Sequence, residues 1–542
     1  MSFSGLSAQN FSCTLQHPST DAAAQAFRRA DYSKASELYA AAAKANAKDM
    51  AAIAGEVRSL LKQEQVDAAA DLAEKSVAAN PKSAELMAAL GEVRFRQGRL
   101  IDALHAYQDS LRRDPCLARA YYDAYKFLWV ESMYASGYRS LQTAYQLEPD
   151  DPAIQLAWIE HLPPAQRVGR IQSYLASDQE TADKKKSLQA DADRLKAILA
   201  AKNGGGCRLA SDSITSTTLP FRYLDKDELG VYHGLGFDVK VNKKAQTSLE
   251  LDTGSSGILL NRRTAARAGL VPITKDTISG IGDEKAMTGY WAYADDLRIG
   301  SLEFKNCLVE VSDKHSHLDV DGLIGADVFE NYHVQLDFPL RQMTLSPLPD
   351  LPDSTGTHTT SLNANGEDGG TVESAVQSKN ASSVPAAVPA IHYHNRYVSP
   401  DMRSWSPFAR FGHQILITGN LKDGKPRLFL IDSGSNVTFL SVAAAKSVGK
   451  VHTDFDDRVT GLNGQVKKLY TANRVDVVFA NLRAPLASVM VMNLDSLNQS
   501  NGTELSGILG LETLRFLTVD IDYRDGLIHL DYDRKHGANV YQ

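Results

Sequence analysis

Two segments of the chain each place an aspartate in a tight turn with the same neighbours. Residues 249–270 read LELDTGSSGILLNRRTAARAGL and residues 429–450 read FLIDSGSNVTFLSVAAAKSVGK. An alignment of Asp252 with Asp432 needs no gap and also aligns the glycine and serine that follow each aspartate. Two carboxylates held close together share one proton, because like charges at short range cannot both ionise easily. Such a pair could activate a water as general base and protonate a carbonyl.

The residues around each aspartate suit a sharp turn at the end of an apolar strand (LEL or FLI). In each turn a hydroxyl residue can brace the opposite loop, a glycine allows close approach of the backbone, and a serine can hydrogen-bond the carboxylate. These supporting residues are Thr253, Gly254 and Ser255 in the first turn and Ser433, Gly434 and Ser435 in the second.

The match between the two halves extends beyond the turns. An apolar-apolar-Gly strand recurs at a similar distance after each aspartate, ending at Gly325 in the first half and at Gly510 in the second. Such a strand can cross behind the turn and lock it. Asp337 and Asp522 also match, but we expect both to be structural turn residues. The internal evidence therefore indicates one β-rich lobe that has been duplicated.

These turns and the later LIG and ILG signatures resemble those of aspartic peptidases. The lobes are short and are more similar to retropepsin-like lobes, here in tandem in one chain, than to those of pepsin. The resemblance implies peptide-bond hydrolysis with Asp252 and Asp432 as the catalytic pair, no metal and no cofactor, and an extended peptide held beneath two flaps. The flap residues carried over by position are Gly280, Ile281, Gly282, Gly461 and Leu462. The sequence departs from the family pattern at Ser433 and Asn436, and the first flap lacks a tyrosine near its tip.

The N-terminal part shows a different repeat. Pro81, Pro115 and Pro149 recur at a constant spacing, Ala47 takes the preceding equivalent place, and a small residue lies twelve positions before each. The period of about 34 residues resembles that of tetratricopeptide repeats, which stack into a concave solenoid that often binds peptides or proteins. An alanine-rich helical bundle with chance proline spacing is the alternative.

The fold class expected is thus multidomain: an all-α tetratricopeptide-like solenoid followed by an all-β bilobal aspartic-peptidase fold. The expected boundaries are 16–160 for the repeats, 161–206 for a helical extension with a glycine hinge, 221–350 for lobe 1, 351–399 for a disordered linker and 400–535 for lobe 2. We expect the two lobes to pair within one chain, because a linker of this length can span them.

Composition sets limits on partners and compartment. A net charge of −7 over 542 residues does not suit nucleic-acid binding, and the sequence has no apolar run long enough to span a membrane. The first residues lack the features of a signal peptide. The four cysteines lie far apart, so free thiols and a cytoplasmic location are expected, or secretion or the periplasm if the true N-terminus is missing. The histidines of 315–317 and 392–394 have no carboxylate or cysteine at ligand spacing, so we expect polar loops there and no metal.

The function expected is that of an aspartic endopeptidase whose helical repeats recruit a peptide or protein substrate or a protein partner. One alternative is a catalytically inactive peptide-binding or scaffold protein that uses the same cleft and repeats. Another is an interaction protein in which the repeats carry the function and the β-lobes form a dimerisation unit.

Overall fold

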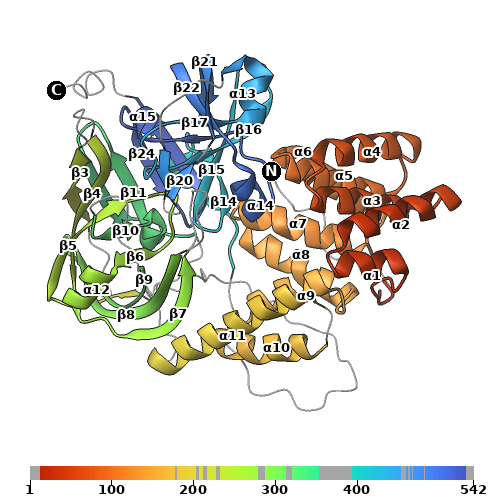
Figure 1. Cartoon of the computed structure of the whole chain (residues 1–542), viewed down its shortest axis with the longest axis horizontal. Coiled ribbons are helices and arrows are strands. Elements are labelled where there is room, and N and C mark those ends of the chain that lie inside the picture. The colour runs from red at the N-terminus through yellow and green to blue at the C-terminus, as the bar shows by residue number, and fades with distance from the viewer. Residues whose placement is uncertain are drawn as a thin grey trace.

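The computed structural model places a helical part beside two β-rich lobes (Figure 1). It describes residues 13–177, 180–202, 207–210, 216–226, 232–278, 287–312, 320–352, 393–452, 459–461, 464–466, 468–480 and 482–532. Most of the expected linker, 351–399, and the glycines of the expected hinge, 204–206, lie outside the described residues.

The helices follow the repeat period of the sequence. Helices α3, α5, α7 and α9 begin at residues 50, 84, 118 and 152, and α2, α4, α6 and α8 begin at residues 32, 66, 100 and 134, so the spacing is the same throughout. The helices are α1 (Ala22–Arg28), α2 (Tyr32–Ala45), α3 (Met50–Lys62), α4 (Val66–Ala79), α5 (Ala84–Arg96), α6 (Leu100–Arg113), α7 (Ala118–Val130), α8 (Tyr134–Leu147), α9 (Pro152–Glu160), α10 (Pro164–Ala176) and α11 (Ala182–Lys202). This register confirms a tetratricopeptide-like solenoid.

Small side chains let neighbouring helices of the solenoid approach closely. Ala35, Ala69 and Ala103, which precede the repeat prolines or Ala47 by twelve residues, are completely buried. A Cβ on Gly91 would lie 2.4 Å from the ring of Tyr107, so the ring of α6 packs directly on the backbone of α5. The small residues that recur with the repeat period therefore lie where the helices pack together.

Lobe 1 is built on a nine-stranded sheet with the order β1-β9-β6-β10-β5-β4-β8-β7, and β3 is added beside β4. Its strands are β1 (Arg208–Leu209), β3 (Arg222–Lys226), β4 (Tyr232–Val241), β5 (Ala245–Leu251), β6 (Ile258–Asn261), β7 (Pro272–Ile278), β8 (Met287–Ile299), β9 (Leu302–Ser312) and β10 (Gly322–Ile324). Helix α12 (Arg262–Ala268) follows β6 and the 3₁₀ helix η1 (Ala326–Phe329) follows β10.

Lobe 2 repeats this framework in an eight-stranded sheet, order β14-β15-β16-β23-β17-β22-β21-β18. Its strands are β14 (Ala409–Phe411), β15 (Gln414–Asn420), β16 (Pro426–Ile431), β17 (Phe439–Ser441), β18 (Val451–His452), β21 (Leu469–Phe479), β22 (Leu482–Met492) and β23 (Gly507–Leu509). The remaining elements are η2 (Pro400–Met402), the hairpin of β19 (Val459–Gly461) and β20 (Gly464–Val466), and the helices α13 (Val442–Val448), α14 (Asp495–Asn501) and α15 (Leu511–Leu514).

A six-stranded sheet joins the lobes within the single chain, as expected. Its central pairing sets β11 of lobe 1 antiparallel to β24 of lobe 2, with Val334 opposite Ile521. Its strands, in sheet order, are β13 (Ser406–Pro407), β25 (Leu527–Asp531), β24 (Thr518–Asp522), β11 (Tyr332–Asp337), β12 (Gln342–Pro347) and β2 (Thr217–Pro220).

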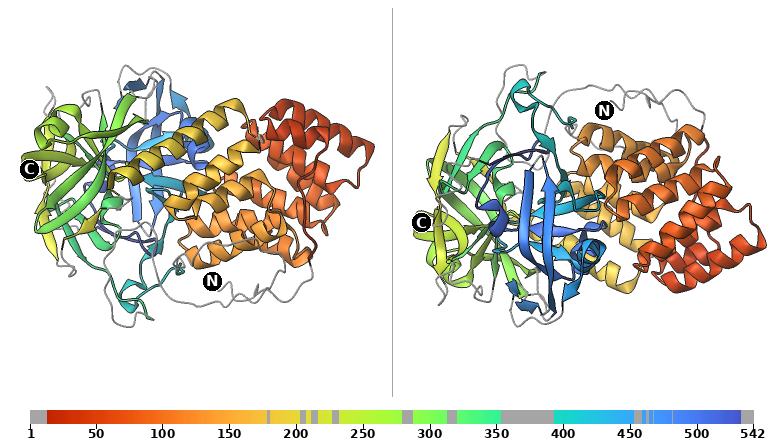
Figure 2. Two further views of the ribbon diagram at one scale, coloured as in Figure 1. Left: turned by 90° about the horizontal axis from the view of Figure 1, so that it is seen from below. Right: turned by 90° about the horizontal axis from the view of Figure 1, so that it is seen from above.

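The repeats lie directly against lobe 2 (Figures 1 and 2). They share a hydrophobic core with it and are not a detached module. Helices α5, α6 and α7 contribute Phe95, Leu104 and Phe127, and lobe 2 contributes Leu428 and Leu430. At the edge of this core the backbone of lobe 2 also hydrogen-bonds the end of α5, where the N–H of Glu504 donates to the carbonyl of Arg96 at 2.8 Å. Helix α11 in turn lies against β7 of lobe 1.

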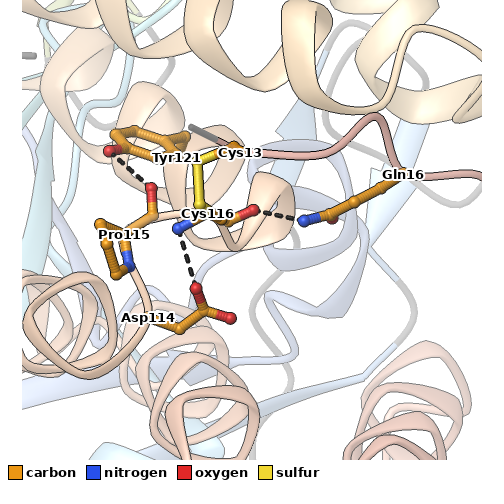
Figure 3. Close-up of a disulfide and its surroundings, with 6 residues drawn as sticks. All are labelled: Cys13, Gln16, Asp114, Pro115, Cys116 and Tyr121. Atoms are coloured by element: carbon orange, nitrogen blue, oxygen red, sulfur yellow. Dashed lines mark hydrogen bonds between the residues drawn. A yellow bond between two sulfur atoms is a disulfide. The ribbon is translucent and has the colours of Figure 1, made fainter. Parts of the chain in front are cut away.

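Two disulfides show that the expectation of free thiols is wrong. Cys13 pairs with Cys116, and Cys207 pairs with Cys307. The first bond ties the N-terminal segment to the loop between α6 and α7, where Gln16 also donates to the carbonyl of Cys116 (Figure 3). The second lies beside the pairing of β1 with β9. The winding of the solenoid and the pairing of strands bring together cysteines that are distant in sequence, which cysteine spacing alone does not reveal.

Within the described residues, no helix is both long and apolar enough to cross a membrane.

Candidate active site

The two matched aspartates lie at the ends of equivalent strands and face each other between the lobes. Asp252 follows β5 and Asp432 follows β16. The strands that cross behind them, β10 and β23, run parallel to β5 and β16. Their carbonyls accept the aspartate N–H groups, Ile324 from Asp252 at 3.0 Å and Leu509 from Asp432 at 3.1 Å. The apolar-apolar-Gly strands therefore lock the two turns, as the sequence indicated.

The hydroxyl residues of the two turns brace the opposite lobe. The Thr253 hydroxyl donates to the carbonyl of Ile431 at 2.9 Å, and the Ser433 hydroxyl donates to the carbonyl of Leu251 at 2.8 Å. Each hydroxyl oxygen also accepts the backbone N–H of the other residue, at 2.9 Å in Thr253 and 3.1 Å in Ser433. All four groups are buried, so this closed network fixes the two turns relative to each other.

Each turn needs a glycine, because the carboxylate of the opposite turn leaves no room for a Cβ. A Cβ on Gly254 would lie 2.8 Å from Cγ of Asp432, and one on Gly434 would lie 2.5 Å from Cγ of Asp252. Each glycine also donates its N–H to the aspartate of its own turn, at 2.8 Å to Asp252 and 3.0 Å to Asp432. Each glycine thus holds one carboxylate and makes room for the other.

The two carboxyls form one titrating unit. Burial raises the pKa of Asp252, and the charge of Asp432 and a hydrogen bond between the two side chains raise it further, well above its usual range. Burial also raises the pKa of Asp432, although the hydrogen bonds from Asp252 and from the N–H of Gly434 oppose this effect. The pair therefore holds one proton between two carboxyls, and this proton belongs to the pair as a whole.

Other residues of the turns have roles that differ from expectation. The Ser435 hydroxyl donates to the carbonyl of Val437 at 2.9 Å and not to a carboxylate, because the turn leaves that carbonyl within reach. Ser255 contributes its backbone N–H, which donates to the carbonyl of Asp252 at 3.1 Å. Asn436, a departure from the family pattern, accepts the N–H of Gly234 across the lobes at 3.3 Å.

The flap positions are only partly described. Gly280, Ile281, Gly282 and Leu462 lie outside the described residues, and Gly461 ends strand β19 of a short hairpin. The strands that lead into the first flap position, β7 and β8, form a hairpin in which Ile278 pairs with Met287.

A histidine that the sequence interpretation missed contacts the first turn from the other lobe. Nε2 of His413, between β14 and β15, lies 2.8 Å from the carbonyl oxygen of Gly254. A positive charge on this ring lowers the pKa of Asp252. The ungapped alignment of Asp252 with Asp432 places His233 at the position of His413, so the duplication itself carried a signal for this histidine.

The remaining candidates fall outside the site. Asp337 and Asp522 accept backbone N–H groups three residues ahead, at 2.9 and 3.0 Å, which confirms them as structural turn residues. His315, His317 and His392 lie outside the described residues, and Nε2 of His394 lies 3.4 Å from Asp525. Among the described residues, no group of three or more histidine, cysteine, aspartate or glutamate side chains could hold a metal ion.

A family comparison agrees with the division of the C-terminal part into two lobes. A family model described as aspartyl protease matches residues 237–328 and again residues 417–513, one match in each lobe. A solved thermophilic tetratricopeptide-repeat protein of Thermus thermophilus is 24% identical over 32% of this chain and 95% of its own, with a TM-score of 0.26. The assignment of the repeats rests instead on the constant register of the helices. No curated protein matches the chain. The C-terminal part of the chain therefore resembles the aspartyl protease family in each of its two lobes, and it follows N-terminal helical repeats of the tetratricopeptide type.

Proposed function

We propose that the protein is an aspartic endopeptidase in which Asp252 and Asp432 activate a water for attack on a peptide bond. The observation that supports this most is the crossed arrangement of the two turns, in which each glycine makes room for the opposite carboxylate. A pair of unrelated structural turn aspartates would not need that space.

The residues around the pair suit the chemistry of the proposal. A singly protonated pair offers a carboxylate that accepts a proton from water and a carboxylic acid that donates one to the substrate carbonyl. The network of Thr253 and Ser433 holds the two groups at fixed positions, so little reorganisation is needed during reaction. When the tetrahedral intermediate collapses, the carboxyl that took the proton from water donates it to the leaving amine, and the other carboxyl takes a proton from a hydroxyl of the intermediate, which restores the starting state.

The proposal includes a role for the repeats in recruiting a substrate or a protein partner. Helices α5 to α7 already use one part of their surface to hold lobe 2. A peptide or partner bound elsewhere on the solenoid would therefore be presented at a fixed position relative to the site.

Cleavage of a diverse peptide library, read by mass spectrometry between about pH 3.5 and 7.5, tests the enzyme proposal. Wild type is compared with Asp252→Asn and Asp432→Asn, and Asp337→Asn is the matched control, since Asp337 is duplicated between the lobes but lies in a turn away from the pair. We expect cuts by wild type and by the control and none by either site variant.

Two results would count against the enzyme proposal. Cuts that persist in either site variant would remove the aspartate pair from the reaction. A folded wild-type protein that binds peptides of the library but cuts none would instead favour the inactive peptide-binding or scaffold function.

We also infer that the protein works in an oxidising compartment, in place of the cytoplasm expected from the sequence. Two disulfides support this, because such bonds persist mainly outside reducing compartments. Alkylation of thiols in intact cells followed by mass spectrometry tests it. Alkylated Cys13, Cys116, Cys207 and Cys307 in the native protein would contradict the inference.

A further inference from the structure

Glu250 lies on the same face of lobe 1 as the aspartate of the proposed pair. Side chains alternate along a strand, and in β5 Leu249 and Leu251 point into the hydrophobic core of the lobe. Glu250 therefore points to the opposite face, which it shares with Asp252 just past the end of the strand. The two carboxyls are separated by one residue on a common surface.

The carboxyl of Glu250 is enclosed. The residue is 1% exposed, and among the described residues neither carboxyl oxygen has a hydrogen-bond partner. The backbone of β4 covers it so closely that a Cβ on Gly234 would lie 2.8 Å from Oε1. Buried polar groups are almost always paired, because an unpaired one costs free energy, so this exception needs an explanation.

The framework of the lobe does not require an acid at this position. Leu430 is the equivalent residue of β16 in the ungapped alignment of the two turns, and it is buried to the same extent. Both residues pair with the strand that crosses behind the turn, Glu250 with Leu323 and Leu430 with Ile508. A leucine thus fits the same backbone in lobe 2, and the glutamate of lobe 1 carries a stability cost that the fold could avoid.

Glu250 interacts electrostatically with both aspartates of the pair. Burial first, and then the charge of Asp252, raise the pKa of Glu250 to about 8. A charge on Glu250 in turn raises the pKa of Asp432. The described residues packed beside it on β4 and β10 are Gly234, Gly236 and Leu323, which bring no charge.

The other charged groups of this region are already engaged. Further along the same face Arg222 pairs with Asp238, and His413 contacts the carbonyl of Gly254. The three acidic groups Glu250, Asp252 and Asp432 are therefore coupled to one another, without a described cation paired to Glu250.

We propose that Glu250 is a positioning residue of the active site and adds a third carboxyl to the Asp252–Asp432 pair. Once Glu250 has lost its proton, its negative charge raises the pKa of Asp432 and so helps to keep the shared proton on the pair. Glu250 touches no reacting atom in this role and acts through the two aspartates. The catalytic consequence rests on the proposed peptidase function, whereas the coupling of the three carboxyls does not.

The pH dependence of kcat/KM for a cleaved peptide tests the catalytic consequence, with wild type beside Glu250→Gln and Glu250→Leu. We expect both variants to keep kcat within about twofold at acid pH, where Glu250 is protonated and uncharged. In both variants we expect the alkaline limb of the kcat/KM profile to move to lower pH by about one unit, because the negative charge of Glu250 no longer helps the pair to keep its proton. Asp238→Asn, which removes a carboxyl from the same sheet face, is the control and should leave the alkaline limb in place. Alkaline limbs that coincide in wild type and Glu250→Gln would overturn the proposal, as would an equal loss of kcat at every pH.

A carboxyl titration followed by NMR gives a readout that does not depend on cleavage. With ¹³C labels on the aspartate and glutamate carboxyls, one glutamate signal should titrate near pH 8 in wild type and be missing in Glu250→Gln. The alkaline step of the Asp252 and Asp432 signals should move to lower pH in the variant. If the protein cuts no peptide but these shifts occur, the peptidase proposal fails while the coupling stands. If the aspartate signals titrate identically in both proteins, the coupling fails whatever the activity.

Discussion

The two lobes share one framework but cover one sheet face in different ways. In lobe 2 this face lies in the core shared with the helical repeats, whereas in lobe 1 it carries Glu250 beneath the backbone of β4 and a small apolar cluster that includes Ile278 and Met287. The equivalent residues are Leu428, Leu430, Phe439 and Ile508 in lobe 2 and Ser248, Glu250, Leu259 and Leu323 in lobe 1.

The turn residues are similar in the two lobes, whereas the sheet face behind the turns differs. The residues of the crossed network and the crossed glycines are alike in both lobes, because each lobe must hold the carboxylate of the other. The composition of the sheet face behind the turns depends on the element that covers it. This face is apolar in lobe 2, where helices cover it, and partly polar in lobe 1, where a strand hairpin covers it. Duplication thus preserved the site more strictly than the packing around it.

Substitution of the two turn glycines should cause the largest loss of activity. Gly254→Ala and Gly434→Ala should each lower kcat/KM for a cleaved peptide by at least about 100-fold, because a Cβ at either position displaces the opposite carboxyl. Gly449→Ala is a suitable control, since a Cβ there meets no atom within 4 Å. A variant that keeps near-normal activity at one of the two glycines would show that the turns are not equivalent.

The substitution Glu250→Leu gives lobe 1 the residue that lobe 2 has at the equivalent position. The pKa of Glu250 in the folded protein, about 8, lies above its ordinary value of 4.5, so the folded state binds this proton more tightly than the unfolded state. Stability is therefore unaffected below about pH 4, falls as the pH rises, and stops falling above about pH 8. Glu250→Leu should remove this loss.

We accordingly expect Glu250→Leu to raise the free energy of unfolding by about 3 kcal/mol more at pH 7 than at pH 4. Urea denaturation at the two pH values measures the difference. A gain of equal size at both values would mean that apolar packing, and not the removal of the carboxyl, explains the effect.

The smallest effect concerns the one chemical difference within the crossed network, threonine in lobe 1 and serine in lobe 2. Thr253→Ser keeps the hydroxyl that donates to Ile431, and it should cost about 1 kcal/mol of stability for the lost methyl and leave kcat nearly unchanged. Thr253→Val, which keeps the shape but removes the hydroxyl, should cost clearly more, because the N–H of Ser433 then loses its acceptor. Equal unfolding free energies for the two variants would contradict a bracing role of this hydroxyl.

Much of the candidate site could be predicted from the sequence, because the two halves of the β-rich region can be aligned with each other. The ungapped alignment of the two halves located both turns, and the later apolar-apolar-Gly segments located the strands behind them. The same alignment relates His233 to His413, but a single matched histidine without a flanking pattern does not stand out. Glu250 was missed for the opposite reason, since it is one of the positions at which the two copies differ.

The features that the sequence did not reveal depend on contacts between distant segments. Cysteine spacing carries no information on pairs joined by solenoid winding or strand pairing, and so the free-thiol prediction was wrong. In the core shared by the repeats and lobe 2, the ring of Phe95 lies against that of Phe411, and Leu104 and Leu430 belong to the same cluster. In the sequence, each side alone is an ordinary apolar face. Removing residues 1–200 to test the repeats would consequently expose the apolar face of lobe 2 as well.

This shared core also sets an order for folding during synthesis. Contacts within the helical repeats are local in sequence and form quickly, and the repeats leave the ribosome first. Lobe 1 follows, but β11 cannot pair with β24 until the C-terminal strands of lobe 2 have been synthesised. When lobe 2 emerges, the helices already present an apolar surface on which its sheet can assemble. The repeats would thus act as a built-in template for lobe 2, which is synthesised after them, and we expect refolding of lobe 2 to slow when Phe95 or Phe127 is replaced by alanine.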